Sequence, residues 1–250
     1  MPDATLPRVL RAVVFDVDGT LYRQPPLRRA MALRLMGAHL AHPFRGLTTL
    51  RILSAYRRGQ EALREEPGTG SLGAAQLQFA CRETGARPDE VQATVTRWME
   101  TAPLDLLPRH AQPGMQECIR ELHRRGLKLG VLSDYPADSK LVALGVGAQF
   151  HSVLCAQSDD VGVFKPNPRG ILVSLERLGA QPADALYVGD RVDVDAAAAR
   201  AANVACVILS RRTPRRDDGF LSVRTFDELA RLLADQHQSS GLSSGAQRHE

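Results

Sequence analysis

Lysine is scarce in this sequence of 250 residues, where only Lys128, Lys140 and Lys165 stand beside 29 arginines. The positive charge is therefore carried mainly by guanidinium groups. A guanidinium group can bind two oxygens of one phosphate, but a high arginine content can also result from codon bias alone. The charge permits anionic partners without naming one, because net charge governs steering and solubility rather than fold. The seven histidines show no metal-ligand spacing.

Cysteine and long apolar runs are also rare. The four cysteines have at least 36 residues between neighbours and form no CxxC pair, which excludes a disulfide framework and a zinc pattern. The apolar run 204–209 has six residues, far below the roughly 20 that a membrane span needs. Prolines and charged residues interrupt positions 1–11, so we expect no signal peptide. These absences predict a cytoplasmic protein without a membrane partner.

Five short apolar runs predict buried strands. Their continuous, non-alternating hydrophobicity is typical of a parallel sheet that is covered on both faces. Helical patterns separate most of them, as at 115–122, 171–178 and 194–201, each followed by Gly or Asn as a stop signal. The fold class is therefore α/β, a three-layer α/β/α core with ligands expected beyond the carboxyl ends of the strands. The predicted strands are 12–15, 127–132, 153–155, 185–188 and 204–209.

The segment 23–108 breaks this rhythm, because it carries helical patterns and no convincing strand. A connection this long is implausible as a loop, so we predict an all-helical cap inserted after the first strand. The catalytic core then comprises 10–22 and 109–235, with flexible termini at 1–9 and 236–250. Gly68, Gly70 and Gly73 spell GxGxxG inside the cap, but charged residues precede them, so we expect a flexible connection rather than a dinucleotide site.

Polar residues follow several predicted strands at the edge where sites are built. Asp16 and Asp18 leave the first strand two residues apart, followed by Gly19 and Thr20. Ser133 and Asp134 follow the second, and Asp190 follows the fourth, with Asp193 and Asp195 close behind. Lys165 lies in a loop between them. Carboxylates, a hydroxyl and an ammonium around one sheet edge indicate phosphoryl transfer with a divalent cation.

Together these elements resemble the haloacid dehalogenase superfamily, and in particular its phosphatase branch with a helical cap, similar to phosphoglycolate phosphatases. The resemblance extends from Val13 to about Leu233. Asp16-Val17-Asp18-Gly19-Thr20 is similar to the first motif, Ser133 to the second and Lys165 to the third. Gly189-Asp190 with Asp195 is similar to the fourth. Asp134 stands where relatives often carry Asn.

The resemblance implies a role for each residue. Mg²⁺ would be held by the side chains of Asp16 and Asp190 and the backbone carbonyl of Asp18. Asp16 would attack phosphorus to form an aspartyl phosphate, and Asp18 would act as general acid and then base. Ser133 and Lys165 would bind the phosphoryl group. Asp195 would support Lys165 or a metal-bound water, and Thr20 would support the turn or Asp18.

The resemblance also narrows the reaction and leaves alternatives. An acid at Asp18 is typical of phosphatases and some mutases rather than of the dehalogenase or phosphonatase branches. A helical cap implies a small phosphorylated metabolite as the substrate. A phosphomutase is the alternative with the same chemistry, and a non-catalytic binding or regulatory relative is the alternative from another class.

Arginine clusters allow a third alternative, a nucleic-acid binder. We disfavour it because no aromatic residues are interleaved with the arginines. The cluster at 211–216 is interpreted as a surface loop. Arginines in the first half of the cap are interpreted mostly as solvated, with a few available to meet a carboxylate or second phosphate; they are Arg23, Arg28, Arg29, Arg34, Arg45, Arg51, Arg57 and Arg58.

Overall fold

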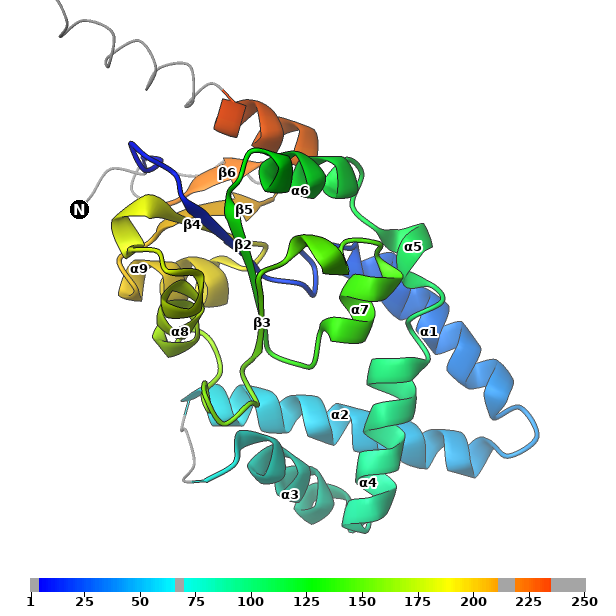
Figure 1. Cartoon of the computed structure of the whole chain (residues 1–250). Helices are drawn as coiled ribbons and strands as arrows, with labels where there is room; N and C mark the ends of the chain where they lie inside the picture. Colours follow the sequence, from blue (N-terminus) through cyan, green and yellow to red (C-terminus); the bar gives the residue numbers. More distant parts are fainter. Residues whose placement is uncertain (1–4, 66–69, 211–218, 235–250) are drawn as a thin grey trace, which may run out of the picture.

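A six-stranded parallel sheet forms the centre of the molecule, in a computed structural model that describes residues 5–65, 70–210 and 219–234. The strand order is β3-β2-β1-β4-β5-β6, so β1 lies in the middle between β2 and β4 (Figure 1). The strands are β1 (Ala12–Phe15), β2 (Lys128–Ser133), β3 (Ser152–Cys155), β4 (Ala185–Gly189), β5 (Ala205–Leu209) and β6 (Leu221–Val223). The predicted α/β class and its parallel sheet are confirmed.

Alternate residues of β1 face two different cores. Val13 and Phe15 pack on one side with α6 (Met115–Arg124) and with the helical residues 226–234. Ala12 and Val14 pack on the other side with α8 (Arg169–Leu178) and α9 (Ala197–Ala201). Both faces are therefore covered, which explains the unbroken apolar runs in the sequence.

The described residues of the inserted segment form helices joined by turns and no strand, as predicted. It comprises α1 (Gln24–Ala38), α2 (Pro43–Glu65), α3 (Leu72–Thr84), α4 (Pro88–Val95) and the wide π-type turn η1 (Thr96–Thr101). Its own small core joins α2, α3 and α4 through Ile52, Ala55, Ala80 and Val91. The chain enters and leaves this segment side by side, because Arg23 N–H donates to His110 O and Gln112 N–H donates to Leu21 O.

The end of the helical segment packs into the hydrophobic core beside the sheet. The predicted boundary at 108/109 falls inside the short helix α5 (Leu107–His110), and Leu107 is buried in the main core. Another short helix, α7 (Asp138–Ala143), follows β2 and places Leu141 in the same core. The exact division into core and cap stays a prediction.

The remaining predictions concern the edge of the sheet, the glycine-rich segment, the arginine cluster, the C-terminal tail and membrane-spanning helices. The edge strand β6 was not predicted, since its three residues include a serine and lack a strong apolar pattern. Gly73 lies inside α3, whereas Gly68, the 211–216 cluster and the tail after 235 lie outside the described residues. No helix among residues 5–65, 70–210 and 219–234 is long and apolar enough to cross a membrane.

Candidate active site

The carboxyl end of β1 presents Asp16, which is 5% exposed, at the centre of a polar cluster. Lys165 Nζ donates to Asp16 Oδ1 at 2.6 Å, and Thr20 Oγ1 donates to Asp16 Oδ2 at 2.9 Å. The Asp16 N–H also donates to the Val188 carbonyl of β4 at 2.9 Å. Backbone and side-chain contacts thus hold the carboxylate in one orientation, although each oxygen keeps a further lone pair for another partner.

Lys165 joins two carboxylates that are far apart in the sequence. Its Nζ lies 2.6 Å from Asp16 Oδ1, 2.7 Å from Asp195 Oδ1 and 3.1 Å from the hydroxyl of Tyr187. Burial opposes the charged form, but Asp16 and Asp195 outweigh it and raise the pKa of Lys165 well above its usual value. The two carboxylates therefore favour the charged form of the lysine.

Asp195 also orders the loop after β4. Its Oδ2 accepts the backbone N–H groups of Asp190 and Arg191 at 3.1 and 3.0 Å. The carboxylate is 1% exposed and lies between these amides and Lys165, so it fixes both. Asp193, two residues away, is exposed and pairs instead with Arg191.

Three carboxylates gather where a cation would fit. One oxygen from each of Asp16, Asp190 and Asp195 lies within 4.8 Å of the others. Burial, and then repulsion from Asp195, raises the pKa of Asp190 to about 7. Burial also raises the pKa of Asp16 well above its usual value despite the neighbouring Lys165. Hard oxygen donors that repel one another suit a divalent cation, which would relieve that repulsion.

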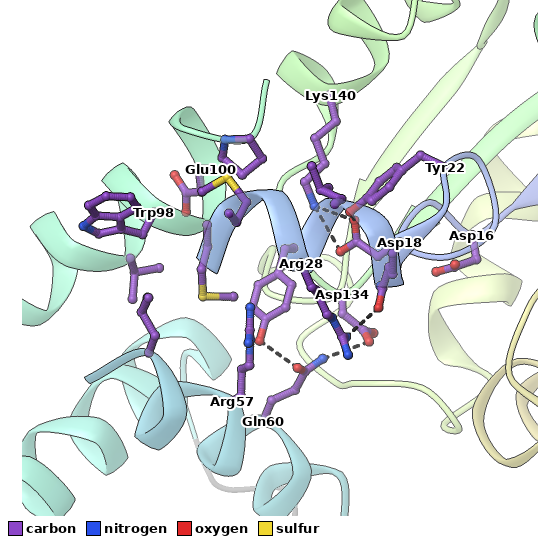
Figure 2. Close-up of a pocket in the computed structure, with 18 of the residues that line it drawn as sticks. Asp16, Asp18, Tyr22, Arg28, Arg57, Gln60, Trp98, Glu100, Asp134 and Lys140 are labelled. Atoms are coloured by element: carbon purple, nitrogen blue, oxygen red, sulfur yellow. Dashed lines mark hydrogen bonds and ion pairs between the residues drawn. The ribbon is translucent and has the colours of Figure 1, made fainter. Parts of the chain in front are cut away.

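Asp18 points away from this cluster. Its two oxygens accept from Lys140 Nζ at 2.7 and 3.0 Å, and the hydroxyl of Tyr22 donates to the same carboxylate (Figure 2). Burial opposes ionisation, but Lys140 and then Tyr22 outweigh it, so the pKa of Asp18 lies below its usual value. The side chain of Asp18 thus lies outside the three-carboxylate cluster.

Ser133 ends β2 and is fully buried. Its Oγ accepts the backbone N–H of Tyr135 at 3.3 Å, so the hydroxyl proton remains able to donate. Asp134 and Tyr135 line the adjoining cavity, but Ser133 is not among the described residues that line it. Of the predicted residues, Asp16, Thr20, Lys165, Asp190 and Asp195 lie together, whereas the side chains of Asp18 and Ser133 make their contacts outside this group. Thr20 donates to Asp16 rather than to Asp18, its expected side-chain partner.

A cavity of about 390 Å³ separates this edge of the sheet from the helical segment (Figure 2). Its polar end contains Asp16, Asp18, Lys165 and Asp190. Its other end lies between α1, α2, α4 and η1 and combines apolar side chains with the charged Arg28, Arg57 and Glu100 (Figure 2). The apolar residues in its wall include Leu27, Met31, Leu35, Leu53, Val95, Trp98 and Met99. The volume is within the range of small-molecule sites.

Arg64 connects the helical segment to the site. It ends α2, and its side chain is 7% exposed. It donates to Asp134 Oδ2 at 2.5 Å and to the Lys165 carbonyl at 2.6 Å, while Gln60 Nε2 donates to Asp134 Oδ2 at 2.9 Å. An aspartate rather than an asparagine at 134 thus supplies a countercharge for the buried guanidinium, in addition to Glu61 at 3.2 Å.

Sequence reasoning missed Lys140, Tyr22 and Arg64. Lys140 could have been singled out from the sequence, because it is one of three lysines and follows Ser133 by seven residues. Tyr22 stands four residues after Asp18 in the first motif. Arg64 carried no signal, since many other arginines occupy the same helices.

The chain matches a family model over residues 10–203, and that model describes a haloacid dehalogenase-like hydrolase. The chain belongs to this family. The hydrolase is 33% identical to a glyceraldehyde 3-phosphate phosphatase of Methanopyrus kandleri, over 84% of this chain and 90% of that protein. It is 30% identical to a phosphoglycolate phosphatase of Rhodospirillum rubrum, over 89% of each chain.

Solved structures agree with the fold. A 2-haloacid dehalogenase from Pseudomonas syringae superposes with a TM-score of 0.61 at 24% identity, covering 91% of this chain and 99% of that one. A haloacid dehalogenase-type phosphatase from Thermococcus onnurineus gives a TM-score of 0.56 at 24% identity, covering 90% and 98%. At this identity the likeness supports the fold of the hydrolase and no particular reaction.

Proposed function

We infer that this hydrolase is a Mg²⁺-dependent phosphatase that cleaves small phosphate monoesters through an aspartyl phosphate on Asp16. The observation that carries the proposal is the placement of Asp16, which lies at the end of the central strand, beside Lys165 and Asp190, and faces the cavity. The phosphatase names of the two relatives and the acid at position 18 support cleavage of a phosphate ester rather than of a carbon–halogen bond.

The cation site fits the carboxylates described above. Asp16 and Asp190 would ligate Mg²⁺ with the Asp18 carbonyl, since Asp195 is already committed to Lys165 and two backbone amides. A bound Mg²⁺ would offset the charge repulsion between a carboxylate nucleophile and an anionic phosphate.

The protein's own groups perform the remaining chemistry. Asp16 attacks phosphorus, and the bond from phosphorus to the ester oxygen breaks while the Asp18 carboxyl gives that oxygen a proton. Asp18 must take up this proton beforehand, against the lowering of its pKa by Lys140 and Tyr22. Water then attacks the aspartyl phosphate, returns a proton to Asp18, and frees Asp16. Lys165 stabilises the phosphoryl charge, and the Ser133 hydroxyl donates to a phosphoryl oxygen.

The direct test is phosphate release across a panel of small phosphate monoesters. We expect release with Mg²⁺, loss of most of the rate after EDTA treatment, and recovery when Mg²⁺ is restored. Activity that survives complete removal of divalent cations would refute the metal-dependent mechanism. Isomerisation of a sugar phosphate with little net phosphate release would identify a phosphomutase instead.

Gly19 provides a second test of the cation site. Its φ is +108°, and a Cβ at this position would overlap the carboxylate of Asp190. Gly19→Ala should therefore displace Asp190 and raise the Mg²⁺ concentration for half-maximal activity by about 10- to 100-fold, as when a ligand loses its support. The matched control is Gly37→Ala in α1, where an added Cβ meets nothing within 4 Å. Equal Mg²⁺ titrations for both variants would contradict the assignment of Asp190.

A further inference from the structure

Two buried lysines are divided between the two aspartates of the first motif. Lys165 lies against Asp16, and Lys140 lies against Asp18. Both lysines are nearly inaccessible, at 3% and 6% exposure, whereas Lys128 is exposed. In a chain rich in arginine, lysine thus occupies the two positions where a compact cation must fit beside a catalytic carboxylate.

The contact between Lys140 and Asp18 is close on both oxygens. Nζ lies 2.7 Å from Oδ1 and 3.0 Å from Oδ2, and Tyr22 donates its hydroxyl to Oδ1. Among the described residues, Asp18 is the one hydrogen-bond acceptor of Lys140. Lys140 comes from α7, 122 residues along the chain, while Tyr22 comes from the same loop as Asp18. The carboxylate is thus held from two independent directions.

This arrangement makes Asp18 and Lys140 depend on each other. A buried ammonium without a partner costs several kcal/mol, so the lysine remains buried because the carboxylate is there. The carboxylate in turn has little freedom to rotate, because rotation would break contacts to both Lys140 and Tyr22. Both Lys140 and Asp18 line the cavity beside Asp16, as Figure 2 shows for the three side chains.

We propose that Lys140 is a positioning residue that, together with Tyr22, holds the carboxyl group of Asp18 where it exchanges a proton with the substrate. The proposal rests on the phosphatase function above. In the first step Asp16 forms a bond to phosphorus, the ester bond breaks, and its electron pair and the Asp18 proton go to the leaving oxygen. In the second step water gives a proton to Asp18 as its oxygen displaces Asp16 from phosphorus. A carboxyl group out of place slows both proton transfers.

The test is a double-mutant cycle of Lys140→Met and Asp18→Asn. With an alkyl phosphate, Lys140→Met should lower kcat by up to about 100-fold, the lower end of general acid–base catalysis, with KM little changed. In the Asp18→Asn background the same substitution should cause little further loss, because Lys140 acts through Asp18. An equal loss in both backgrounds would overturn the proposal.

The leaving group supplies a readout that a purely structural defect would not give. p-Nitrophenolate leaves without a proton, so Lys140→Met should still release a burst of about one p-nitrophenol per enzyme molecule before slow turnover. The alkyl phosphate should give no such burst in the variant. Absence of the burst with p-nitrophenyl phosphate, or an equal burst with both esters, would contradict a role in proton transfer.

Three controls make the outcomes distinct. Lys128→Met, at an exposed lysine, should match the wild type, and thermal melting shows whether each variant folds. If Lys140→Met does not fold, Lys140→Gln keeps an amide donor at the position and replaces it in the cycle. If the wild type releases no phosphate from any ester, the proposed function fails. If the wild type is active and both Lys140 variants match it, only the positioning role fails.

Discussion

Replacing Asp16 with asparagine is expected to lower turnover of every accepted phosphate ester by more than about 10⁴-fold. The amide cannot attack phosphorus, so the covalent route through an acyl phosphate is lost, and losing a nucleophile removes most of an enzyme's acceleration. The measurement is phosphate release in the presence of Mg²⁺, with melting curves to establish that the variant folds.

The matched control for this substitution is Asp193→Asn. Asp193 leaves the same sheet edge but is exposed and paired with Arg191, so its loss should change turnover by no more than about twofold, in line with ordinary surface substitutions. The wild type should also yield a phosphorylated protein on rapid quenching, with the label released by hydroxylamine as expected for an acyl phosphate. Full turnover in Asp16→Asn would refute the nucleophilic role.

Replacing Lys165 with methionine should lower the free energy of unfolding by about 3–5 kcal/mol, because it leaves two buried carboxylates without their cation. Asp16 and Asp195 lie 2.6 and 2.7 Å from Lys165 Nζ, and all three side chains are at most 8% exposed. The measurement is urea unfolding in EDTA, since a bound divalent cation would substitute for part of the lost charge.

Two companion variants isolate the cause of that loss. Lys128→Met, at the exposed start of β2, should change stability by less than about 0.5 kcal/mol. Adding Asp195→Asn to Lys165→Met removes one of the stranded charges and should recover part of the stability. If Lys165→Met were as stable as Lys128→Met, the buried triad would not stabilise the fold.

The strand ends were predictable from the sequence because parallel strands converge at one edge. Asp16, Asp190 and Asp195 therefore meet as expected, although as many as 179 positions separate their numbers. The direction in which a side chain points at a strand end was harder to predict from the sequence. Ser133 was expected just after the second strand and is the last residue of β2, but its hydroxyl lies against the backbone of Tyr135 and it is not among the described cavity-lining residues.

Contacts between elements that are remote in sequence could not be predicted. The pair of Lys140 and Asp18 depends on how α7 leaves β2, and the pair of Arg64 and Asp134 depends on where the end of α2 lies over the sheet. Neither orientation is encoded in a local pattern. The expectation that the arginines at the front of the helical segment are mostly solvated agrees with the exposed Arg58, whereas Arg34 is half-buried. Arg28 and Arg57 line the cavity, and the buried Arg64 was not among the predicted arginines.

The contact between α2 and the sheet edge is partly polar and partly aromatic. Gln60 and Arg64 meet Asp134 and Tyr135 through hydrogen bonds and charge, while the ring of Tyr56 stacks on that of Tyr135 with centroids 6.1 Å apart. When the polar groups separate, water replaces each partner, so the net cost of a broken hydrogen bond is about 1 kcal/mol. Separating the two rings would expose apolar surface and raise the heat capacity. We therefore expect an opening of this contact to bring a positive heat-capacity change that is small beside that of unfolding the core.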